Sequence, residues 1–181
     1  EYCRDGGALA EHPLAGAVPG VEFATGSMGH GLAVAAGMAG AFKIRGESRR
    51  VFVLMGDGEC DEGAVWEAAA LASARELDNL VALVDCNGLQ ACDTCANVSP
   101  HVSLPASWAA HGWEVEEMDG HDVTGLRGLL SRAVTTGRPR VILCRTVKGK
   151  GLGAMEGTIL CHYRSLHGRE KDDAHRSVDR A

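Results

Sequence analysis

Residues 51–63 read VFVLMGDGECDEG, and this stretch decides the fold class. Its apolar beginning predicts a short buried strand over residues 50–55, ended by Gly56. The loop that follows carries four acidic side chains: Asp57, Glu59, Asp61 and Glu62. Residues 61–77 are rich in Ala, Glu and Leu, with acids in the first turn, and predict a helix. A buried strand that leads directly into a helix is the repeating unit of an α/β domain.

The same alternation continues along the chain. Apolar runs at 80–84 and 140–144 predict two more buried strands, and residues 113–118 are a further candidate. A helical period of apolar residues covers 122–136, and small residues predict a closely packed helix over 28–42. The sequence therefore predicts an α/β fold with a doubly wound, mostly parallel sheet and helices on both faces.

Composition excludes several classes of protein. The chain has 181 residues, enough for one domain with a sizeable core, and its net charge of −6 argues against a nucleic-acid-binding surface. It contains no apolar run of about 18 residues, the length that a membrane helix needs. The first residues lack the basic start and apolar core of a signal peptide. We therefore expect a cytoplasmic protein that binds neither membrane nor nucleic acid.

The seven cysteines are odd in number and irregularly spaced, which favours reduced thiols in a cytoplasmic protein. Cys92 and Cys95 form a CxxC pair, but no second pair or histidine accompanies them at zinc-site spacing. We interpret this pair as a coincidence within a loop.

Three polar segments follow predicted strands, at 56–63, 85–90 and 146–151. Ligands of open α/β sheets bind beyond the carboxyl ends of the strands, so these segments are candidates for a binding site. The first segment enters a helix N-terminus, whose free N–H groups suit a phosphate. Its carboxylates would repel a phosphate unless a cation lay between them, and Mg²⁺ prefers such oxygen ligands. The sequence therefore predicts a divalent cation and a phosphate group here.

The candidate ligands of this cation are the side chains of Asp57 and Asn87 and the backbone carbonyl of Leu89. Twenty-eight residues separate Gly58 from Asn87, the length of one helix and one strand, so the two loops should be neighbours. Two other interpretations remain open. Asp57 can cap the following helix, and Asn87 can be a turn residue before Gly88.

Asp57 belongs to a GDG sequence that precedes Asn87 by about 30 residues, which is the thiamine diphosphate motif. With ATGSMGHGL at 24–32 and TVKGKG at 146–151 in the same order, the chain resembles the N-terminal part of transketolases. The resemblance covers nearly the whole chain. Its layout is similar to the stand-alone N-terminal subunit of a split, two-gene transketolase.

The resemblance implies a thiamine diphosphate-binding fold, its diphosphate-binding domain, with thiamine diphosphate and Mg²⁺ as cofactors. The metal ligands would be Asp57, Asn87 and the carbonyl of Leu89. The implied cofactor contacts come from the motif glycines, from Asn87 and from three residues of the flanking motifs: Gly26, Met28, Gly56, Gly58, Asn87 and Val147.

The resemblance also implies two histidines that face the reacting carbon and the phosphate. His12, in the H-P pair, and His162, in CHYR, match these positions, and His167 is an alternative to His162. An ordinary loop histidine remains a possible interpretation of His12. His111 and His121 are expected to be structural, and Glu62 matches a glutamate near the subunit contact rather than a ligand.

The implied activity is the transfer of a two-carbon ketol unit from a ketose to an aldose, often phosphorylated. A companion subunit with the pyrimidine-binding domain would complete the enzyme, and a lone copy would expose apolar surface. Glu11 stands where the family usually has glycine, and Cys161 where it usually has tryptophan. Acyl transfer from an α-keto acid, or an idle cofactor-binding subunit, therefore remain alternatives.

The resemblance further predicts the domain organisation. Residues 1–167 would form the diphosphate- and magnesium-binding domain without the family's earlier segment, which carries two more histidine motifs. Residues 168–181 are polar and are expected to form a tail that lies at the surface or is partly disordered.

Overall fold

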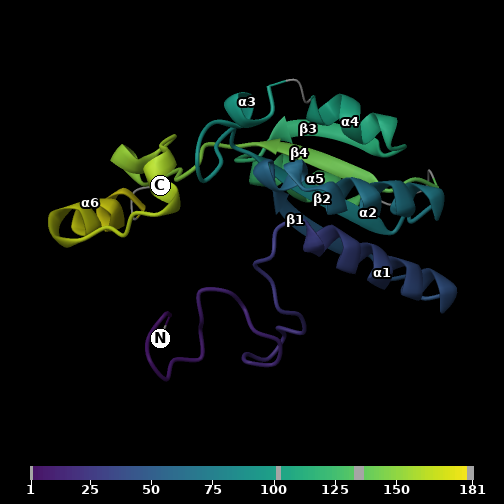
Figure 1. Cartoon of the computed structure of the whole chain (residues 1–181), viewed down its shortest axis with the longest axis horizontal. Coiled ribbons are helices and arrows are strands. Elements are labelled where there is room, and N and C mark those ends of the chain that lie inside the picture. Colours follow the sequence, from purple (N-terminus) through teal and green to yellow (C-terminus); the bar gives the residue numbers. More distant parts are fainter. Residues whose placement is uncertain (1, 101–102, 133–136, 179–181) are drawn as a thin grey trace.

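A computed structural model describes residues 2–100, 103–132 and 137–178. A four-stranded sheet lies at its centre, made of β1 (Val51–Gly56), β2 (Leu80–Cys86), β3 (Glu114–Asp119) and β4 (Arg140–Arg145) (Figure 1). The strand order is β1-β2-β4-β3 and every neighbouring pair is parallel. The parallel sheet predicted from the apolar runs is confirmed, with all four strands within two residues of their expected ends.

Helices cover both faces of the sheet. One face carries α1 (His30–Ile44), α2 (Gly63–Ala74) and α4 (Leu104–Ala110), whose side chains join the larger core cluster. The other face carries α5 (Val123–Ser131), which packs on Val81, Ile142 and Cys144. The doubly wound arrangement is therefore confirmed.

Small side chains let α1 and α2 pack closely against each other and against the sheet. Both helices bury mainly alanines: Ala35, Ala36 and Ala39 on α1, and Ala68, Ala69 and Ala72 on α2. The prediction of a small-residue helix that packs close to a neighbour is confirmed by this interface. Beside it, the three tryptophans fill the wider space under α4. Trp108 lies 4.8 Å from Trp113 and 5.1 Å from Trp66 between ring centroids.

The carboxyl ends of three strands are aligned at one edge of the sheet. Gly56 of β1 pairs with Asp85 of β2, and Cys86 of β2 pairs with Arg145 of β4. The loops at 57–63, 87–90 and 146–151 therefore begin side by side, as the sequence predicts. In Figure 1 both chain termini also lie beyond this edge.

Several elements differ from the expectations. The predicted helix at 61–77 is a short 3₁₀ helix, η1 (Gly58–Asp61), followed by α2 after a change of direction at Glu62. Two short helices, α3 (Cys95–Val98) and α4, were not predicted. The predicted helix at 122–136 is α5, and residues 133–136 lie outside the described residues.

The polar tail lies at the surface and is helical over its described part, as α6 (Gly168–Val178). Its side chains are exposed or half-buried, so the expected surface location agrees, whereas a disordered tail does not describe these residues. Arg164 donates to both carboxylate oxygens of Glu170 at 2.7 Å, which fixes the start of the helix. Before it lie two 3₁₀ turns, η2 (Gly153–Met155) and η3 (Ile159–His162). Among the described residues, no helix has the length and apolar character to span a bilayer.

One stability prediction compares two leucines of opposite exposure. Leu32 on α1 is 0% exposed in the core, and Leu54 on β1 is 73% exposed. Leu32→Ala should lower the free energy of unfolding by about 2–5 kcal/mol, because it leaves a cavity. Leu54→Ala should change it by about 0.5 kcal/mol or less, as is usual for surface sites. Urea unfolding measures both, and equal losses would contradict the assignment of the core.

Candidate functional site

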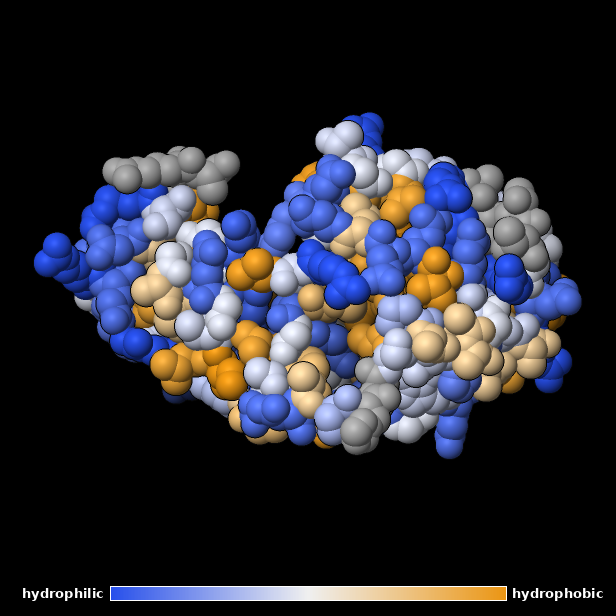
Figure 2. Space-filling view, turned by 90° about the horizontal axis from the view of Figure 1, so that it is seen from above, coloured by the Kyte–Doolittle hydropathy of each residue, from blue (hydrophilic) through white to orange (hydrophobic). Residues whose placement is uncertain are grey.

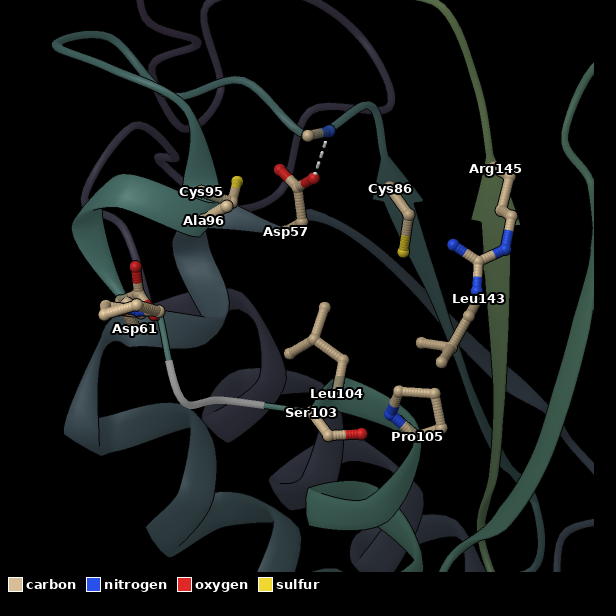
Figure 3. Close-up of a pocket in the computed structure, with 13 residues that line it drawn as sticks. Asp57, Asp61, Cys86, Cys95, Ala96, Ser103, Leu104, Pro105, Leu143 and Arg145 are labelled. Atoms are coloured by element: carbon tan, nitrogen blue, oxygen red, sulfur yellow. Dashed lines mark hydrogen bonds between the residues drawn. The ribbon is translucent and has the colours of Figure 1, made fainter.

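The Asp57 carboxylate joins the ends of β1 and β2. Asp57 follows the last residue of β1 and is only 7% exposed. Its Oδ1 accepts a hydrogen bond from the Gly58 N–H at 2.9 Å, and its Oδ2 accepts one from the Gly88 N–H at 2.6 Å (Figure 3). The backbone adds a third link, from the Asp57 N–H to the Asp85 carbonyl at 3.1 Å. The two loops that the crossover length predicts to be neighbours are therefore bound directly to each other.

The turn after β2 presents the other candidate ligands. The Asn87 Oδ1 accepts from the Leu89 N–H at 3.0 Å, which shapes the turn, and Gly88 has a φ of +74°, a conformation that favours glycine. Gly58 packs against Gln90 so closely that a Cβ at Gly58 would lie 2.9 Å from its Cγ. Both loops thus approach each other at the level of the backbone.

The other acidic side chains of the loop hold neighbouring segments. The Glu59 Oε1 accepts from the Gly29 N–H at 2.8 Å, which attaches the segment before α1. Asp61 accepts from Gln90 Nε2 at 2.6 Å and from Ser99 Oγ at 2.8 Å. These carboxylates are therefore neutralised in part by donors of the protein itself. Glu59 and Asp61 are thus bound within the protein, whereas the need for a cation between these acids and a phosphate stays a prediction.

Asp57 retains the properties of a metal ligand. Both alternative interpretations of the sequence are seen in the structure: Asp57 caps η1, and the Asn87 side chain forms a hydrogen bond within its turn. A carboxylate offers about four lone-pair positions, and Asp57 uses two of them. Among the described residues, no three His, Cys, Asp or Glu side chains form a metal cluster. One carboxylate, one amide and one carbonyl fit Mg²⁺ if substrate or cofactor oxygens complete the shell.

His12 and Gly26 lie in direct contact in the segment before α1. Gly26 has a φ of +120°, and a Cβ built on it would lie 1.8 Å from the His12 Cδ2. Only glycine leaves room for the imidazole ring at this place. Met28 follows two residues later and is about half exposed. The structure brings His12, Gly26 and Met28 together, and Glu59 ties this segment to the Asp57 loop through Gly29.

The loop after β4 carries Val147. The Thr146 N–H donates to the Cys86 carbonyl at 3.3 Å, and the Thr146 hydroxyl donates to Asp85. The Val147 N–H donates to the Nε2 of His121 at 2.9 Å. This bond agrees with the structural role expected for His121, although the sequence did not indicate Val147 as its partner.

The C-terminal segment folds back over the same loop. A Cβ at Gly149 would lie 2.8 Å from the Cys161 Sγ, and the Gly157 N–H donates to the Lys148 carbonyl at 2.8 Å. His162 follows Cys161, is exposed, and stacks edge-on against Tyr163 with 4.7 Å between ring centroids. His167 is also exposed, in the link before α6. Within the described part of the chain, neither histidine shares a hydrogen bond or a ring contact with His12.

Two hollows flank the Asp57 loop. A cavity of about 410 Å³ lies between Asp57, Asp61 and Arg145 on one side and Leu104 and Pro105 on the other (Figure 3). A larger groove of about 1050 Å³ runs between β1, α1 and the segment at 23–28. Seen from above, the surface also has a hollow between the C-terminal segment, which ends in α6, and the part of the molecule that contains the sheet (Figure 2).

Two thiols lie beside the Asp57 loop, Cys60 buried and Cys86 half-buried. Burial raises the pKa of the Cys60 thiol to about 12, with the neighbouring Cys86 and Asp57 adding to the effect. Burial, then Asp57, likewise raises the pKa of Cys86 to about 12. All seven cysteines are free thiols, and Cys92 is exposed while Cys95 is half-buried. The thiols beside Asp57 therefore stay neutral and act as small apolar groups.

Comparisons with known proteins identify relatives over almost the whole chain. The family model described as the transketolase, thiamine diphosphate binding domain matches residues 2–178. The chain is 38% identical over 93% of its length to an apulose-4-phosphate transketolase subunit of Actinobacillus succinogenes, and covers 61% of that protein. It is 36% identical over 90% of its length to the 6-deoxy-6-sulfo-D-fructose transketolase subunit of a Clostridium species, and covers 60% of it.

Solved structures agree with these relatives. The transketolase of Leishmania mexicana superposes with a TM-score of 0.79 at 25% identity, covering 99% of this chain and 32% of that one. The transketolase of Campylobacter jejuni gives a TM-score of 0.74 at 29% identity, over 86% of this chain and 26% of that one. The chain thus spans about three fifths of the subunit-type relatives and about a quarter to a third of these transketolases.

Gly26→Ala tests the contact between Gly26 and His12. The added methyl group should displace the imidazole and lower the free energy of unfolding by about 1–3 kcal/mol, since the backbone conformation there also disfavours alanine. The His12 ring signals in an NMR spectrum should shift. Gly63→Ala is the matched control, because a Cβ at Gly63 meets nothing within 4 Å. Unchanged His12 signals in Gly26→Ala would contradict the placement.

Thiol labelling tests the burial around Asp57. At pH 8 a thiol with a pKa of about 12 is ionised in only about one molecule in 10⁴, so Cys60 and Cys86 should resist iodoacetamide. Cys3 and Cys92 are exposed and should be modified first. Mass spectrometry of tryptic peptides measures the order. Modification of Cys60 in the folded chain as fast as that of Cys92 would be the contrary result.

Proposed function

Because the chain belongs to the transketolase family and is its thiamine diphosphate-binding domain, we propose that it is the N-terminal subunit of a split transketolase. Its activity is the transfer of a two-carbon ketol unit from a ketose to an aldose. The single observation that supports this most is the Asp57 carboxylate held between the ends of β1 and β2, with Asn87 and Leu89 in the adjoining turn.

The site residues have distinct roles in this proposal. Asp57, Asn87 and the Leu89 carbonyl hold Mg²⁺, and Gly56 and Gly58 let the diphosphate approach the backbone. Gly26, Met28 and Val147 contact the cofactor rings. When bound, thiamine diphosphate supplies the nucleophilic carbon and the electron sink that ketol transfer needs. The alignment of the strand ends at one edge of the sheet supports these roles.

His12 and His162 move protons of the substrate hydroxyl groups in this proposal. Histidine suits this task because it gains and loses a proton near neutral pH. The fixed position of His12 on Gly26 supports its role. His162 directly follows Cys161, which contacts Gly149 of the Val147 loop, and this contact supports His162 over His167.

The complete enzyme requires a companion subunit with the pyrimidine-binding domain. The subunit-type relatives, named as subunits and longer than this chain, support this part of the proposal. The substrates are a small ketose and aldose with an anionic group, since one relative is named for a sugar phosphate and another for a sulfosugar. The same names support a role in carbohydrate metabolism, and a cytoplasmic location is part of the proposal.

Asp57→Asn in the complex with the companion subunit tests the proposal. The substitution removes the one charged ligand of the proposed set and leaves a neutral amide oxygen, so thiamine diphosphate affinity should fall about 100-fold and ketol transfer should be lost. Titration calorimetry with Mg²⁺ present measures the affinity. Removal of Mg²⁺ by EDTA should have the same effect on the unmodified complex, and added Mg²⁺ should reverse it.

Asp93→Asn is the matched control. Among the described residues, the Asp93 side chain bonds Thr94 and Asn97, which are its near neighbours in sequence, so both measurements should stay unchanged. An unfolding curve of Asp57→Asn separates loss of the ligand from loss of the fold, because one of the two hydrogen bonds from backbone N–H groups is also lost, at about 1–3 kcal/mol. Equal affinity in Asp57→Asn and the unmodified chain would refute the metal site. Cofactor binding without ketol transfer would support the idle subunit instead.

A further inference from the structure

His121 is attached to the proposed cofactor loop by a hydrogen bond that spans two elements. Its Nε2 lies 2.9 Å from the backbone nitrogen of Val147, 26 residues further along the chain. His121 belongs to the turn between β3 and α5, whereas Val147 lies beyond the end of β4. The bond therefore joins the outer edge of the sheet to the loop that follows its inner strand.

The turn that carries His121 is itself held in place. The His121 N–H donates to Asp119 Oδ1 at 2.9 Å, and the Val123 N–H donates to the His121 carbonyl at 3.1 Å. Asp122 caps α5 by accepting from the Gly125 N–H at 2.9 Å. The ring of His121 thus projects from a turn whose backbone is fixed on both sides.

Gly120 brings this turn against the end of β4. Its N–H donates to the Arg145 carbonyl at 2.8 Å. A Cβ at Gly120 would lie 2.5 Å from the Thr146 Cγ2 and 3.0 Å from the Cys144 Cβ. Only glycine allows this approach, and the approach places the His121 ring within reach of the next amide.

The loop after β4 is therefore held on two sides, by β2 and by the turn that follows β3. On the β2 side, Thr146 bonds the Cys86 carbonyl and the Asp85 carboxylate. On the β3 side, the Val147 N–H bonds the His121 ring. Without the ring this N–H would turn toward solvent, since Val147 is 40% exposed. The Val147 carbonyl accepts from the Lys150 N–H within the loop, and the imidazole is the side-chain group that holds the Val147 N–H.

We propose that His121 is a positioning residue that holds the Val147 loop in the orientation required for contact with thiamine diphosphate. The inference rests on the proposed function, which places Val147 against the cofactor. Nε2 can accept this hydrogen bond only when the His121 ring is neutral and carries its proton on Nδ1. The same bond leaves Nε2 without a free lone pair for proton transfer, so His121 acts through Val147 rather than on the substrate.

Three variants separate the hydrogen bond from the shape of the ring. His121→Phe keeps a planar ring but has no acceptor. His121→Gln offers a carbonyl oxygen at nearly the reach of Nε2, and His121→Asn offers one that falls short of it. His111→Phe is the matched control, because His111 bonds its own helix at Ser107 and stacks on Trp66.

The first readout uses the chain alone and requires no activity. Hydrogen exchange of the Val147 amide, followed by NMR, should be slow in the unmodified chain and in His121→Gln. It should become fast in His121→Phe and His121→Asn, while His111→Phe leaves it unchanged. The second readout is thiamine diphosphate affinity of the complex with the companion subunit, with Mg²⁺ present. His121→Phe should weaken it about fivefold, the equivalent of one hydrogen bond, and His121→Gln should restore it.

Each contrary result has a separate meaning. Equal amide exchange in His121→Phe and the unmodified chain would refute the bond to Val147. Altered exchange with unchanged affinity would refute the positioning role while leaving the proposed function intact. If the unmodified complex binds no thiamine diphosphate, the proposed function fails, and the positioning role fails with it even where the amide is protected.

Discussion

The candidate site depends on one carboxylate that bridges two strand ends. At the carboxyl edge of a parallel sheet, the first N–H groups after each strand point outward without a partner in the ladder. Asp57 satisfies one such N–H on its own loop, at Gly58, and one on the next loop, at Gly88. Hydrogen bonds to a charged acceptor are about twice as strong as neutral ones, so these two bonds fix the position of one loop relative to the other. A loop pair fixed in this way can present its oxygens to a cation without first losing conformational freedom.

The remaining attachments follow the same principle, in which a side chain of one loop binds the backbone of another. Glu59 binds the N–H of Gly29, and His121 binds that of Val147. Glycines at the contact points permit the necessary proximity, as Gly26 does for His12 and Gly120 does for Thr146. Loops without regular structure thus form a defined surface because each is anchored to a strand end. The substitution of a larger residue at these points would change distances in the site without removing any reactive group.

The fold was largely predictable from the sequence, and the site was predictable in part. Apolar runs mark β2 and β4 because both faces of the sheet are buried there. The run of β1 is equally apolar, although Phe52 and Leu54 on one of its faces are exposed. The neighbouring positions of Asp57 and Asn87 follow from the length of the crossover. The partners of Glu59, Asp61 and His121 were not predictable, because each contact joins segments 26 to 38 residues apart and has no periodic signature. Helix α6 was missed because its polar composition matches that of a disordered tail, whereas the Arg164–Glu170 pair fixes it locally.

An exposed apolar surface lies beside the candidate site. Phe52 and Leu54 on β1 are 49% and 73% exposed, and Met28 and Phe23 are exposed beside the same groove. Exposed apolar patches of this kind mark surfaces that associate with another polypeptide. Gly26 and Met28, assigned to the cofactor rings, lie on the wall of this groove, whereas Asp57 faces the smaller cavity behind the loop. Under the proposed function, rings in contact with Gly26 and Met28 would lie beside this exposed apolar surface, which a companion subunit would cover. In such an arrangement the rigid anchoring of each loop on this chain matters most, because the companion can align only with a surface that is already formed.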